Sequence, residues 1–315
     1  MKIFRHYRDV PGAYQGAVVA VGNFDGVHRG HQALIAEAGR KAQERGAALC
    51  VLAFEPHPQE FFRPSPQSFR LTPFRVKARL LAELGVDAMF ALPFDAQLAT
   101  KSAQEFVLDV LVGGLAVGCV VVGGDFQFGK GRAGNTTVLA YMGEMEGFGV
   151  EIFDAVSDGD EKISSTAIRA ALREGRPQEA ARLLGHHWAV EARVEHGDKR
   201  GRAIGVPTAN MRLVDCLHPA FGVYAVRASI LEDERVVARH NGVANFGIRP
   251  MFESKVPLLE TLLFDFAGDL YGKHLSVELI AYLRPEMNLP DLASLKAQIA
   301  KDAEAAKAIL AKVTI

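Results

Sequence analysis

Two histidines, His28 and His31, lie three residues apart just after a short apolar run, and their spacing suits phosphate chemistry. The run, residues 17–21, predicts a buried parallel strand, and the apolar positions that follow at helical spacing predict a helix that ends at Gly46. Backbone N–H groups and the positive end of a helix dipole bind anions at such a junction. The pattern therefore predicts a phosphate site, with an ordinary surface pair or a metal pair as the alternatives.

Two more segments follow expected strands and should lie at the same edge of the sheet. The first has a histidine between two prolines, which stiffen the loop and suit a pocket wall. The second carries a carboxylate and two phenylalanines among glycines, which could hold a flat ring by stacking; phenylalanines folded into the core are an equally good interpretation. The residues are Pro56, His57 and Pro58 in the first segment and Asp125, Phe126 and Phe128 in the second.

Hydroxyl side chains open a further expected helix near residue 164, with an arginine one turn later. Such a run presents N–H groups and a guanidinium to an anion, although a capping run without function has the same pattern. The residues are Ser164, Ser165, Thr166 and Arg169.

The second half of the chain has its own candidate site, in a basic, glycine-rich run over residues 197–210. Glycines let a loop approach phosphates closely, and the neutral oxygens of Thr208 and Asn210 suit Mg²⁺. Glu260 lies on a strand-like run and could act as a base; a basic turn and an outward strand residue are the alternatives. The loop residues singled out are Gly201, Arg202, Gly205 and Pro207.

The elements that position these residues change character near Gly185. Up to there, strand patterns alternate with helix patterns, which predicts an α/β domain with a doubly wound parallel sheet. Thr72 is expected to cap a helix that ends at Gly85, and Asn135 to cap another. The capping box from Ser102 to Glu105 opens a third helix, and its expected apolar side consists of Phe106, Leu108 and Leu111.

Beyond residue 185, short strands with period-two patterning alternate with turn clusters. This arrangement predicts an antiparallel β-barrel or sandwich closed by a C-terminal helix over residues 292–310. The expected domains are therefore residues 1–185 and 186–315.

Composition narrows the class of protein further. A 315-residue chain with 49% hydrophobic and 23% charged residues fits a globular protein of two domains. The net charge of −1 argues against nucleic-acid binding, and three scattered cysteines suggest no disulfide framework and a reducing cytoplasm. We expect no signal peptide and no membrane partner, and a homo-oligomer is compatible with the sequence.

The motifs together resemble one known family. Residues 22–31 are similar to the signature of HIGH-type nucleotidylyltransferases. With Phe-Glu-Pro-His-Pro, Gly-Asp-Phe-Gln-Phe-Gly and Ile-Ser-Ser-Thr-Ala-Ile-Arg, they resemble the adenylyltransferase module of the prokaryotic bifunctional riboflavin kinase/FAD synthetase family. Gly-Val-Pro-Thr-Ala-Asn and the strand with Glu260 resemble that family's riboflavin kinase module.

The resemblance implies roles for individual residues. In the adenylyltransferase module, Arg169 and the two histidines would be catalytic, and the segments at Pro56 and Asp125 would bind the flavin. In the kinase module, Glu260 would be the base, the 201–207 loop would bind ATP phosphates, and Thr208 and Asn210 would also contact Mg²⁺. The implied ATP-binding residues of the first module are Gly22, Asn23, Phe24, His28, His31, Ser164, Ser165, Thr166 and Arg169.

The implied function is a two-step synthesis of flavin coenzymes: riboflavin to FMN, then FMN to FAD, with ATP as co-substrate in both steps. One alternative retains only the FMN adenylyltransferase, with the barrel as a flavin-binding or regulatory module. Others are a non-enzymatic flavin-binding protein and a HIGH-type transferase for another phosphorylated substrate.

Overall fold

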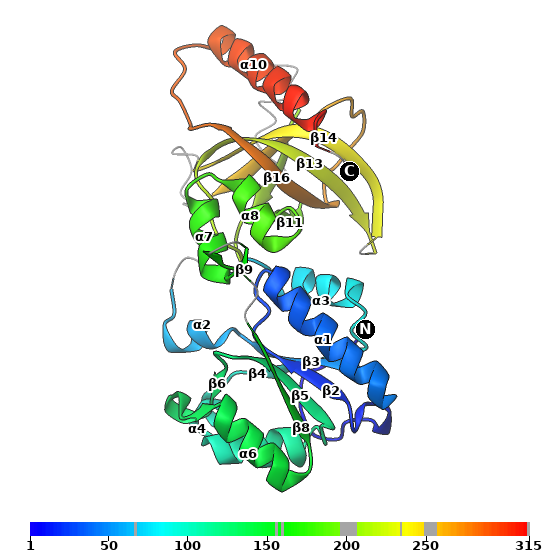
Figure 1. The fold of residues 1–315 in the computed structure, drawn as a ribbon. Coiled ribbons are helices and arrows are strands. Elements are labelled where there is room, and N and C mark those ends of the chain that lie inside the picture. Colours follow the sequence, from blue (N-terminus) through cyan, green and yellow to red (C-terminus); the bar gives the residue numbers. More distant parts are fainter. Residues whose placement is uncertain are drawn as a thin grey trace. The chain divides into compact units, whose positions relative to one another are not determined.

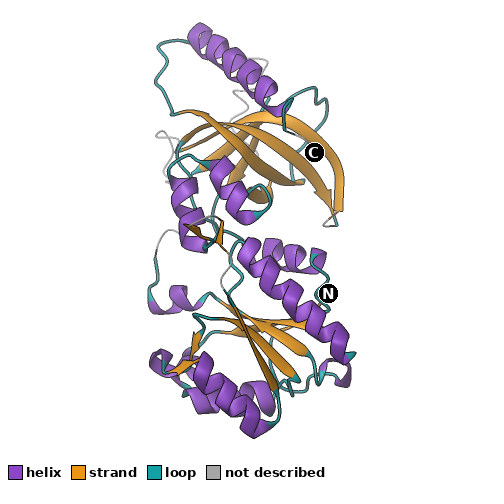
Figure 2. Ribbon diagram, viewed as in Figure 1, coloured by secondary structure: helices purple, strands orange, loops and turns teal. Residues whose placement is uncertain are grey.

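The computed structural model describes residues 1–65, 68–154, 157–158, 161–195, 207–233, 235–248 and 257–313. The chain folds into two compact units, shown with their elements in Figure 1. The N-terminal unit comprises Met1–Pro66 with Thr72–Ser164, and the C-terminal unit comprises Gln67–Leu71 with Ser165–Ile315. Colouring by secondary structure separates an α/β unit from a unit built mainly of long strands (Figure 2).

A parallel sheet of six strands, in the order β1-β4-β3-β2-β5-β8, forms the centre of the N-terminal unit. The predicted parallel sheet is thus confirmed. The sequence pattern did not indicate the edge strand β1, because it has only three residues and is largely exposed. The strands are β1 Lys2–Phe4, β2 Val18–Val21, β3 Leu49–Glu55, β4 Ala88–Pro93, β5 Cys119–Gly123 and β8 Gly149–Phe153.

Helices cover both faces of this sheet. Val18 and Ala20 pack with α1 (Arg29–Arg45) and α3 (Phe74–Glu83), whereas Val19 and Val21 pack with the π-helix η2 (Phe106–Val112) and with α6 (Thr136–Glu146). Both faces of β2 are therefore buried, as expected for a central strand of a doubly wound fold. The unit's shorter elements are η1 Gly12–Tyr14, α2 Pro58–Phe62, α4 Ala96–Thr100, α5 Ala103–Glu105, β6 Gln127–Phe128, η3 Lys130–Arg132, β7 Gly134–Asn135, β9 Ser157–Asp158 and β10 Glu161–Lys162.

Several local signals in the sequence are confirmed. Gly46 ends α1 in the left-handed conformation, with φ of 59°, and Asn135 accepts a hydrogen bond from the N–H of Val138 at 2.9 Å. Ser102 and Glu105 form the reciprocal capping box, with bonds of 3.1 and 2.7 Å.

The expected apolar side of the helix after the capping box was partly wrong. Phe106 and Leu111 are buried, but Leu108 is only half-buried, and Val107 and Val110 take its place in the core. The cause is the π-helical conformation of residues 106–112, which changes the angular spacing on which the prediction rested.

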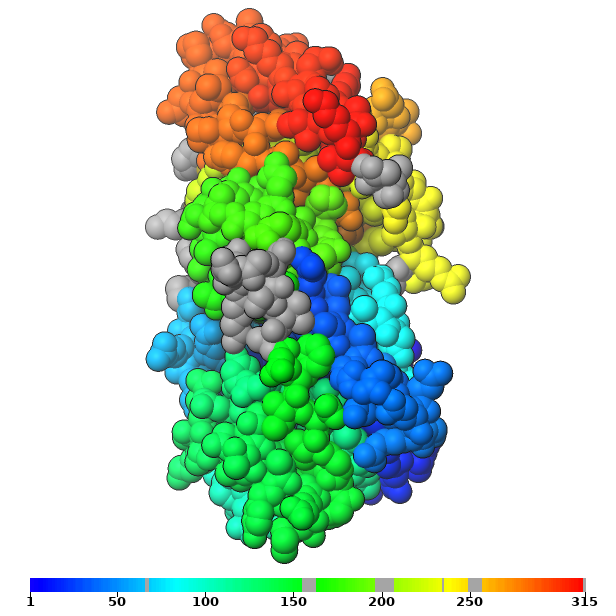
Figure 3. Space-filling view, viewed as in Figure 1, coloured from blue at the N-terminus to red at the C-terminus, as the bar shows by residue number. Residues whose placement is uncertain are grey.

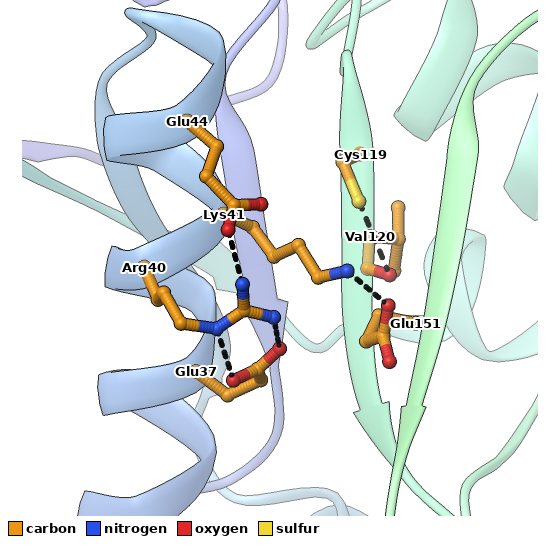
Figure 4. A network of polar contacts seen from close by, with 7 residues as sticks. All are labelled: Glu37, Arg40, Lys41, Glu44, Cys119, Val120 and Glu151. Carbon is orange, nitrogen blue, oxygen red and sulfur yellow. Dashed lines mark hydrogen bonds and ion pairs between the residues drawn. The ribbon is translucent and has the colours of Figure 1, made fainter.

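One ion pair links α1 to the edge of the sheet, beside two pairs within the helix (Figure 4). Lys41 Nζ lies 2.8 Å from Glu151 Oε2 on β8, and Arg40 pairs with Glu37 and Glu44 within the helix. Exposed pairs contribute about 0–1 kcal/mol each. The main anchor of α1 is therefore its apolar side, which consists of Leu34, Ile35, Ala38 and Ala42.

Six antiparallel strands, in the order β11-β16-β13-β14-β15-β12, form the C-terminal unit. An isolated bridge between Glu195 and Asn210 joins the two edges of this sheet and nearly closes it into a barrel, which confirms the predicted class. The first half of β14 is largely exposed and lacks period-two burial, so its pattern did not predict a strand. The strands are β11 Ala189–Arg193, β12 Ala209–Arg212, β13 Gly222–Glu232, β14 Arg235–Gly247, β15 Leu258–Leu263 and β16 His274–Arg284.

The helices α7 (Ser165–Arg173) and α8 (Pro177–Leu184) belong to the C-terminal unit, together with the short segment before Thr72. Trp188 is fully buried, and its Nε1–H donates to the carbonyl of Leu71 at 2.7 Å. The N–H of Leu217 donates to the carbonyl of Arg70, also at 2.7 Å. These bonds explain why a piece of chain from the middle of the first half belongs to the second unit.

The C-terminal helix α10 has the predicted bounds, Leu292–Leu310, and the Asp291 carboxylate caps it by accepting the N–H of Ser294 at 2.7 Å. Arg284 donates to both carboxylate oxygens of the buried Asp302, at 2.7 to 3.2 Å. The inner side of the helix packs on the barrel, and its outer side forms part of the surface of this unit (Figure 3).

Two further findings concern the cysteines and the membrane. Cys50, Cys119 and Cys216 are free and buried, and burial raises the pKa of the Cys50 and Cys216 thiols to about 12. None of the helices in the described part of the chain combines the length and apolarity that a bilayer span requires.

The fork between Arg284 and Asp302 should stabilise the C-terminal unit measurably. Replacing Asp302 with Asn removes the charge that pairs with a half-buried guanidinium, so we expect the free energy of unfolding to fall by about 2 kcal/mol. The chain's single tryptophan, Trp188, reports this unit's unfolding by fluorescence in a denaturant titration.

Glu304→Gln on the same helix is the matched control. Glu304 forms an exposed pair with Lys307, so its loss should change the free energy of unfolding by less than about 0.5 kcal/mol. Equal effects of the two substitutions would show that the fork does not hold α10.

Candidate active sites

The turn between β2 and α1 has an unusual backbone. Phe24, Gly26 and Val27 adopt the left-handed conformation, with φ of 51°, 88° and 44°. This region is sparsely populated by residues other than glycine, and it is a clear outlier for a β-branched valine. Phe24 and Val27 are fully buried in the core below the turn, and their packing holds the strained conformation.

A buried polar contact ties this turn to the start of α3. Asp25 Oδ1 accepts the N–H of Thr72 at 3.1 Å, and the Thr72 hydroxyl accepts the N–H of Gly26 at 2.9 Å. The prediction that Thr72 caps α3 was therefore wrong: Pro73 is the N-cap, with no capping bond from its side chain, because the Thr72 hydroxyl serves the turn. Asp25 and Thr72 are site-building residues that the local pattern did not reveal.

The two histidines lie together at the start of α1, as predicted. His28 is the N-cap, and its Nδ1 accepts the N–H of His31 at 3.3 Å. The rings stack with centroids 3.6 Å apart and planes at 15°. Because Nδ1 is the acceptor, a neutral His28 carries its proton on Nε2, which becomes a hydrogen-bond donor.

Gly30 leaves the space that the His28 ring occupies. A Cβ at position 30 would lie 3.2 Å from His28 Nδ1 and 3.3 Å from Cε1, closer than ordinary contact. Gly22 has a related role, since a Cβ there would lie 3.2 Å from the Phe24 ring. Asn23 lies between these positions, in the turn itself and half-buried.

The electrostatics of the site keep His31 neutral. Burial, with smaller effects from His28 and Lys77, holds the His31 pKa well below its usual range. Its Nδ1 is buried and has no hydrogen-bond partner among the described residues. A polar atom of this kind is costly unless a ligand or water completes it.

Lys77 is a buried cation that the motifs did not single out. It lies on the core side of α3 and is 3% exposed, and its Nζ is 3.9 Å from Glu55 Oε2 at the end of β3. A lysine between Val76 and Ala78 on the inner side of a helix is the signal that could have revealed it.

The segment after β3 begins a short helix. His57 is the N-cap of α2, and its Nδ1 accepts the N–H of Gln59 at 3.1 Å, while Pro58 occupies the first helical position. The peptide bond before Pro56 is cis. Four aromatic rings that the sequence did not single out gather beside this segment, with neighbouring centroids 5.3 to 5.7 Å apart, and Phe62 is the most exposed of them. They belong to Phe54, Phe61, Phe62 and Phe94.

The segment after β5 divides its two phenylalanines between core and surface. Phe128 is 7% exposed and packs against Phe106 in the core. Phe126 is half-buried and stacks on Phe128, with centroids 5.4 Å apart, and Asp125 is exposed. Because β3, β2 and β5 are parallel neighbours, the segments at His28, His57 and Asp125 all follow strands at the same sheet edge, as predicted.

The hydroxyl run spans the division between the two compact units. Ser164 ends the N-terminal unit, while Ser165 and Thr166 form the first turn of α7 in the C-terminal unit. Arg169 Nε donates to the carbonyl of Phe69 at 2.9 Å, and its guanidinium lies 4.9 Å from the Phe69 ring centroid. The predicted helix start is confirmed, and Arg169 also anchors the segment before Thr72 within its own unit.

The candidate site on the barrel is a row of polar residues fixed by strand register. Glu260 on β15 pairs with Asn210 on β12 on one side and with Asn245 on β14 on the other. Burial alternates along β15, with Leu259 and Thr261 buried and Glu260 half-buried on the opposite face. Asn245 was not singled out by the motifs, because only register places it beside Glu260.

The donor set around Asn210 fits a hard cation. Asn210 is buried, its Nδ2 donates to the carbonyl of Thr208 at 3.5 Å, and its Oδ1 is a neutral oxygen of the kind that Mg²⁺ binds. Among the described residues, no group of three or more His, Cys, Asp or Glu side chains could hold a metal. Pro207 precedes this pair, and the other predicted loop residues, Gly201, Arg202 and Gly205, lie outside the described residues.

Comparisons with known proteins agree with a chain of two enzymatic modules. The FAD synthetase family model matches residues 11–167, and the riboflavin kinase family model matches residues 184–310. The predicted order of the two modules is thus confirmed.

Relatives and a solved structure match over nearly the whole chain. The bifunctional riboflavin kinase/FMN adenylyltransferase of Escherichia coli (strain K12) is 42% identical over 96% of both chains, and that of Haemophilus influenzae is 39% identical over 98% of this chain and 99% of the relative. A crystal structure from Streptococcus pneumoniae, described as a macrolide-efflux protein, has a TM-score of 0.84 and 30% identity over 97% of this chain and 98% of that one. The chain belongs to the family of bifunctional riboflavin kinase/FMN adenylyltransferases.

Gly30→Ala should separate stability from activity. Alanine at a helical position is more favourable than glycine by about 1 kcal/mol, yet here its Cβ would displace the His28 ring. We expect FAD formation to fall at least about tenfold, while hydrogen exchange of the β2 and β3 amides shows no loss of stability.

Gly39→Ala is the control on the same helix, since its Cβ would make an ordinary 3.5 Å contact with Leu49. This variant should retain FAD formation. An equal loss of activity in both variants would mean that FAD formation does not depend on the space beside His28.

The lowered pKa of His31 predicts a pH-dependent stability of the N-terminal unit. Below about pH 6.5 the unfolded chain binds a proton that the folded site does not, so acidification destabilises the fold. Between pH 7.5 and 5.5 we expect His31→Gln to lose about 1 kcal/mol less stability than the wild type, measured by hydrogen exchange of the β2 and β3 amides. The same pH dependence in the variant and the wild type would contradict this assignment.

Proposed function

We propose that the chain phosphorylates riboflavin to FMN at the barrel site and adenylylates FMN to FAD at the site on the parallel sheet. The observation that carries this proposal is that each family domain has its own polar site. His28 and His31 lie together in the first, and Asn210, Glu260 and Asn245 lie side by side in the second. Each arrangement suits the reaction that its domain implies.

In the adenylyl transfer, an oxygen of the FMN phosphate attacks the α-phosphorus of ATP. A P–O bond forms between FMN and AMP, the bond to the β-phosphate oxygen breaks, and pyrophosphate leaves. The nucleophile is already an anion, so no base is required, and catalysis consists of positioning and charge stabilisation. The Nε2–H of His28 and the ring of His31 are the donors that we assign to the reacting phosphates, with Arg169 as the proposed third catalytic group.

The remaining groups of this site would bind the two substrates. The turn with Gly22, Asn23 and Phe24 would face ATP with the N–H groups of Asn23 and Phe24, because the Gly22 N–H already donates to the Leu52 carbonyl at 3.1 Å. The hydroxyls of Ser164, Ser165 and Thr166 at the start of α7 suit its β- and γ-phosphates. The flavin ring would lie against the prolines around His57 and against Phe126, near Asp125. Phe128 would support Phe126 from the core without touching the flavin, because it is buried.

In the kinase reaction, the nucleophile is a neutral hydroxyl and gains from a base. We assign this role to Glu260, which would take the proton from the 5′-hydroxyl of riboflavin as the oxygen attacks the γ-phosphorus of ATP. Asn210 and Asn245 are its cross-strand neighbours by register, and Asn245 Nδ2 donates to Glu286 Oε1 at 3.3 Å. Thr208 and Asn210 would hold Mg²⁺, which neutralises phosphate charge, and the loop with Gly201, Arg202, Gly205 and Pro207 would bind the phosphates.

Two coarser features belong to the same proposal. We place the division between the activities at about residue 185, close to residue 184, where the riboflavin kinase family match begins. We propose a cytoplasmic location, which the three free, buried thiols support. The alternative, a barrel that only binds flavin, leaves unexplained why a half-buried carboxylate lies in register beside two asparagines.

The two-site assignment is tested by a pair of variants. His28→Ala should lower FAD formation from FMN by about 10²–10³-fold and leave FMN formation within about twofold, because it removes a donor from only one site. Glu260→Gln should lower FMN formation by about 10²–10⁴-fold and leave conversion of added FMN to FAD intact. Chromatographic initial rates measure both. Parallel loss of both activities in either variant would refute the assignment.

A further inference from the structure

The buried ammonium of Lys77 lies at the reactive edge of the N-terminal sheet. Lysine is rarely buried, because removing its charge from water is costly. Here the side chain is 4% exposed, although α3 has a solvent side on which it could lie. Lys77 is instead on the inner side of the helix, among Val76, Ala78 and Leu81.

Its surroundings connect the two predicted substrate segments. Its Nζ lies 3.9 Å from the carboxylate of Glu55, the residue immediately before Pro56 and the loop assigned to the flavin. The charge of Lys77 also contributes to lowering the pKa of His31. Lys77 therefore pairs with the residue that precedes the segment assigned to FMN, and it acts electrostatically on a residue assigned to the nucleotide.

Adenylyl transfer needs a cation at such a position. The reaction brings the FMN phosphate, with a charge near −2, against the charged α-phosphate of ATP, and like charges at contact repel strongly in a low-dielectric site. The histidines donate hydrogen bonds, but His31 is held neutral and cancels none of this charge. A fixed ammonium offsets part of this negative charge, and it needs no reorganisation during the reaction.

We propose that Lys77 is a further catalytic residue of the adenylyl transfer, whose ammonium contacts the phosphate oxygens shared between FMN and the α-phosphorus of ATP. The proposal rests on the adenylyltransferase function assigned to this unit. Glu55 holds the ammonium near this position before substrates bind. The competing interpretation is a purely structural ion pair between Lys77 and Glu55.

Three variants separate these interpretations. Lys77→Met removes the cation, Lys77→Arg retains it, and Glu55→Gln breaks the ion pair but leaves the cation. For each, FAD formation from FMN and ATP gives kcat and KM for both substrates. Riboflavin phosphorylation by the same preparation serves as an internal standard, because that site lies in the other unit. Lys41→Met, on α1 and paired with Glu151, is the control for removing an ion-paired lysine.

We expect Lys77→Met to lower kcat/KM for FMN by about 10²–10³-fold, with riboflavin phosphorylation within about twofold of the wild type. Lys77→Arg should recover at least about tenfold of that loss, and Glu55→Gln and Lys41→Met should lose less than about tenfold. If Lys77→Met also lowers the thermal midpoint, the kcat/KM values of Lys77→Arg and Glu55→Gln decide between a catalytic cation and a structural ion pair.

The proposal is overturned if Lys77→Met retains FAD formation, or if Glu55→Gln loses as much kcat/KM as Lys77→Met, because the ion pair alone then accounts for the effect. Failure of the assigned function is distinguishable from either outcome. In that case the wild-type chain itself would not convert FMN to FAD.

Discussion

The hydrogen bond from the N–H of His31 to Nδ1 of His28 is the contact on which the N-terminal site depends. It caps the first turn of α1 beside the two stacked rings, and it leaves the proton of a neutral His28 on Nε2, where it can be donated. The bond depends on the conformation of the preceding turn, which places His28 at the start of α1. That turn is strained at Phe24 and Val27, and the burial of both side chains offsets the cost.

The barrel reaches a comparable precision by different means. Antiparallel register places Asn210, Glu260 and Asn245 side by side on one face of three neighbouring strands. The bridge from Glu195 to Asn210 nearly closes the sheet at this row, so the pairing that closes the barrel also fixes the position of Asn210. Two unrelated scaffolds thus position polar groups, one at a helix start and one on a sheet.

Local signals in the sequence predicted the parts of the fold that are set locally. The glycine at position 46, the cap at Asn135 and the bounds of α10 follow from neighbours within one or two turns, and the structure confirms them. The two histidines could be found for the same reason. Thr72 could not be assigned, because its partner, Asp25, is 47 positions away, and a long-range contact overrode a good capping residue.

The other omissions have similar causes. Lys77 reads as an ordinary helix lysine until α3 is placed against the sheet, and Asn245 gains its position only from strand pairing. Phe126 and Phe128 have the same residue type and nearly the same position, yet only packing puts one in the core. Residues whose positions depend on tertiary contacts were therefore harder to identify from the sequence than motifs carried by one turn.

The most direct test of two coupled activities is a chromatographic time course of the purified wild-type chain with riboflavin, ATP and Mg²⁺. Two sequential sites on one chain predict that FMN appears first, passes through a maximum and gives way to FAD. If riboflavin is not phosphorylated while added FMN is converted to FAD, the barrel has no kinase activity and the account of its site is wrong. If neither flavin reacts, the assignment of both sites fails.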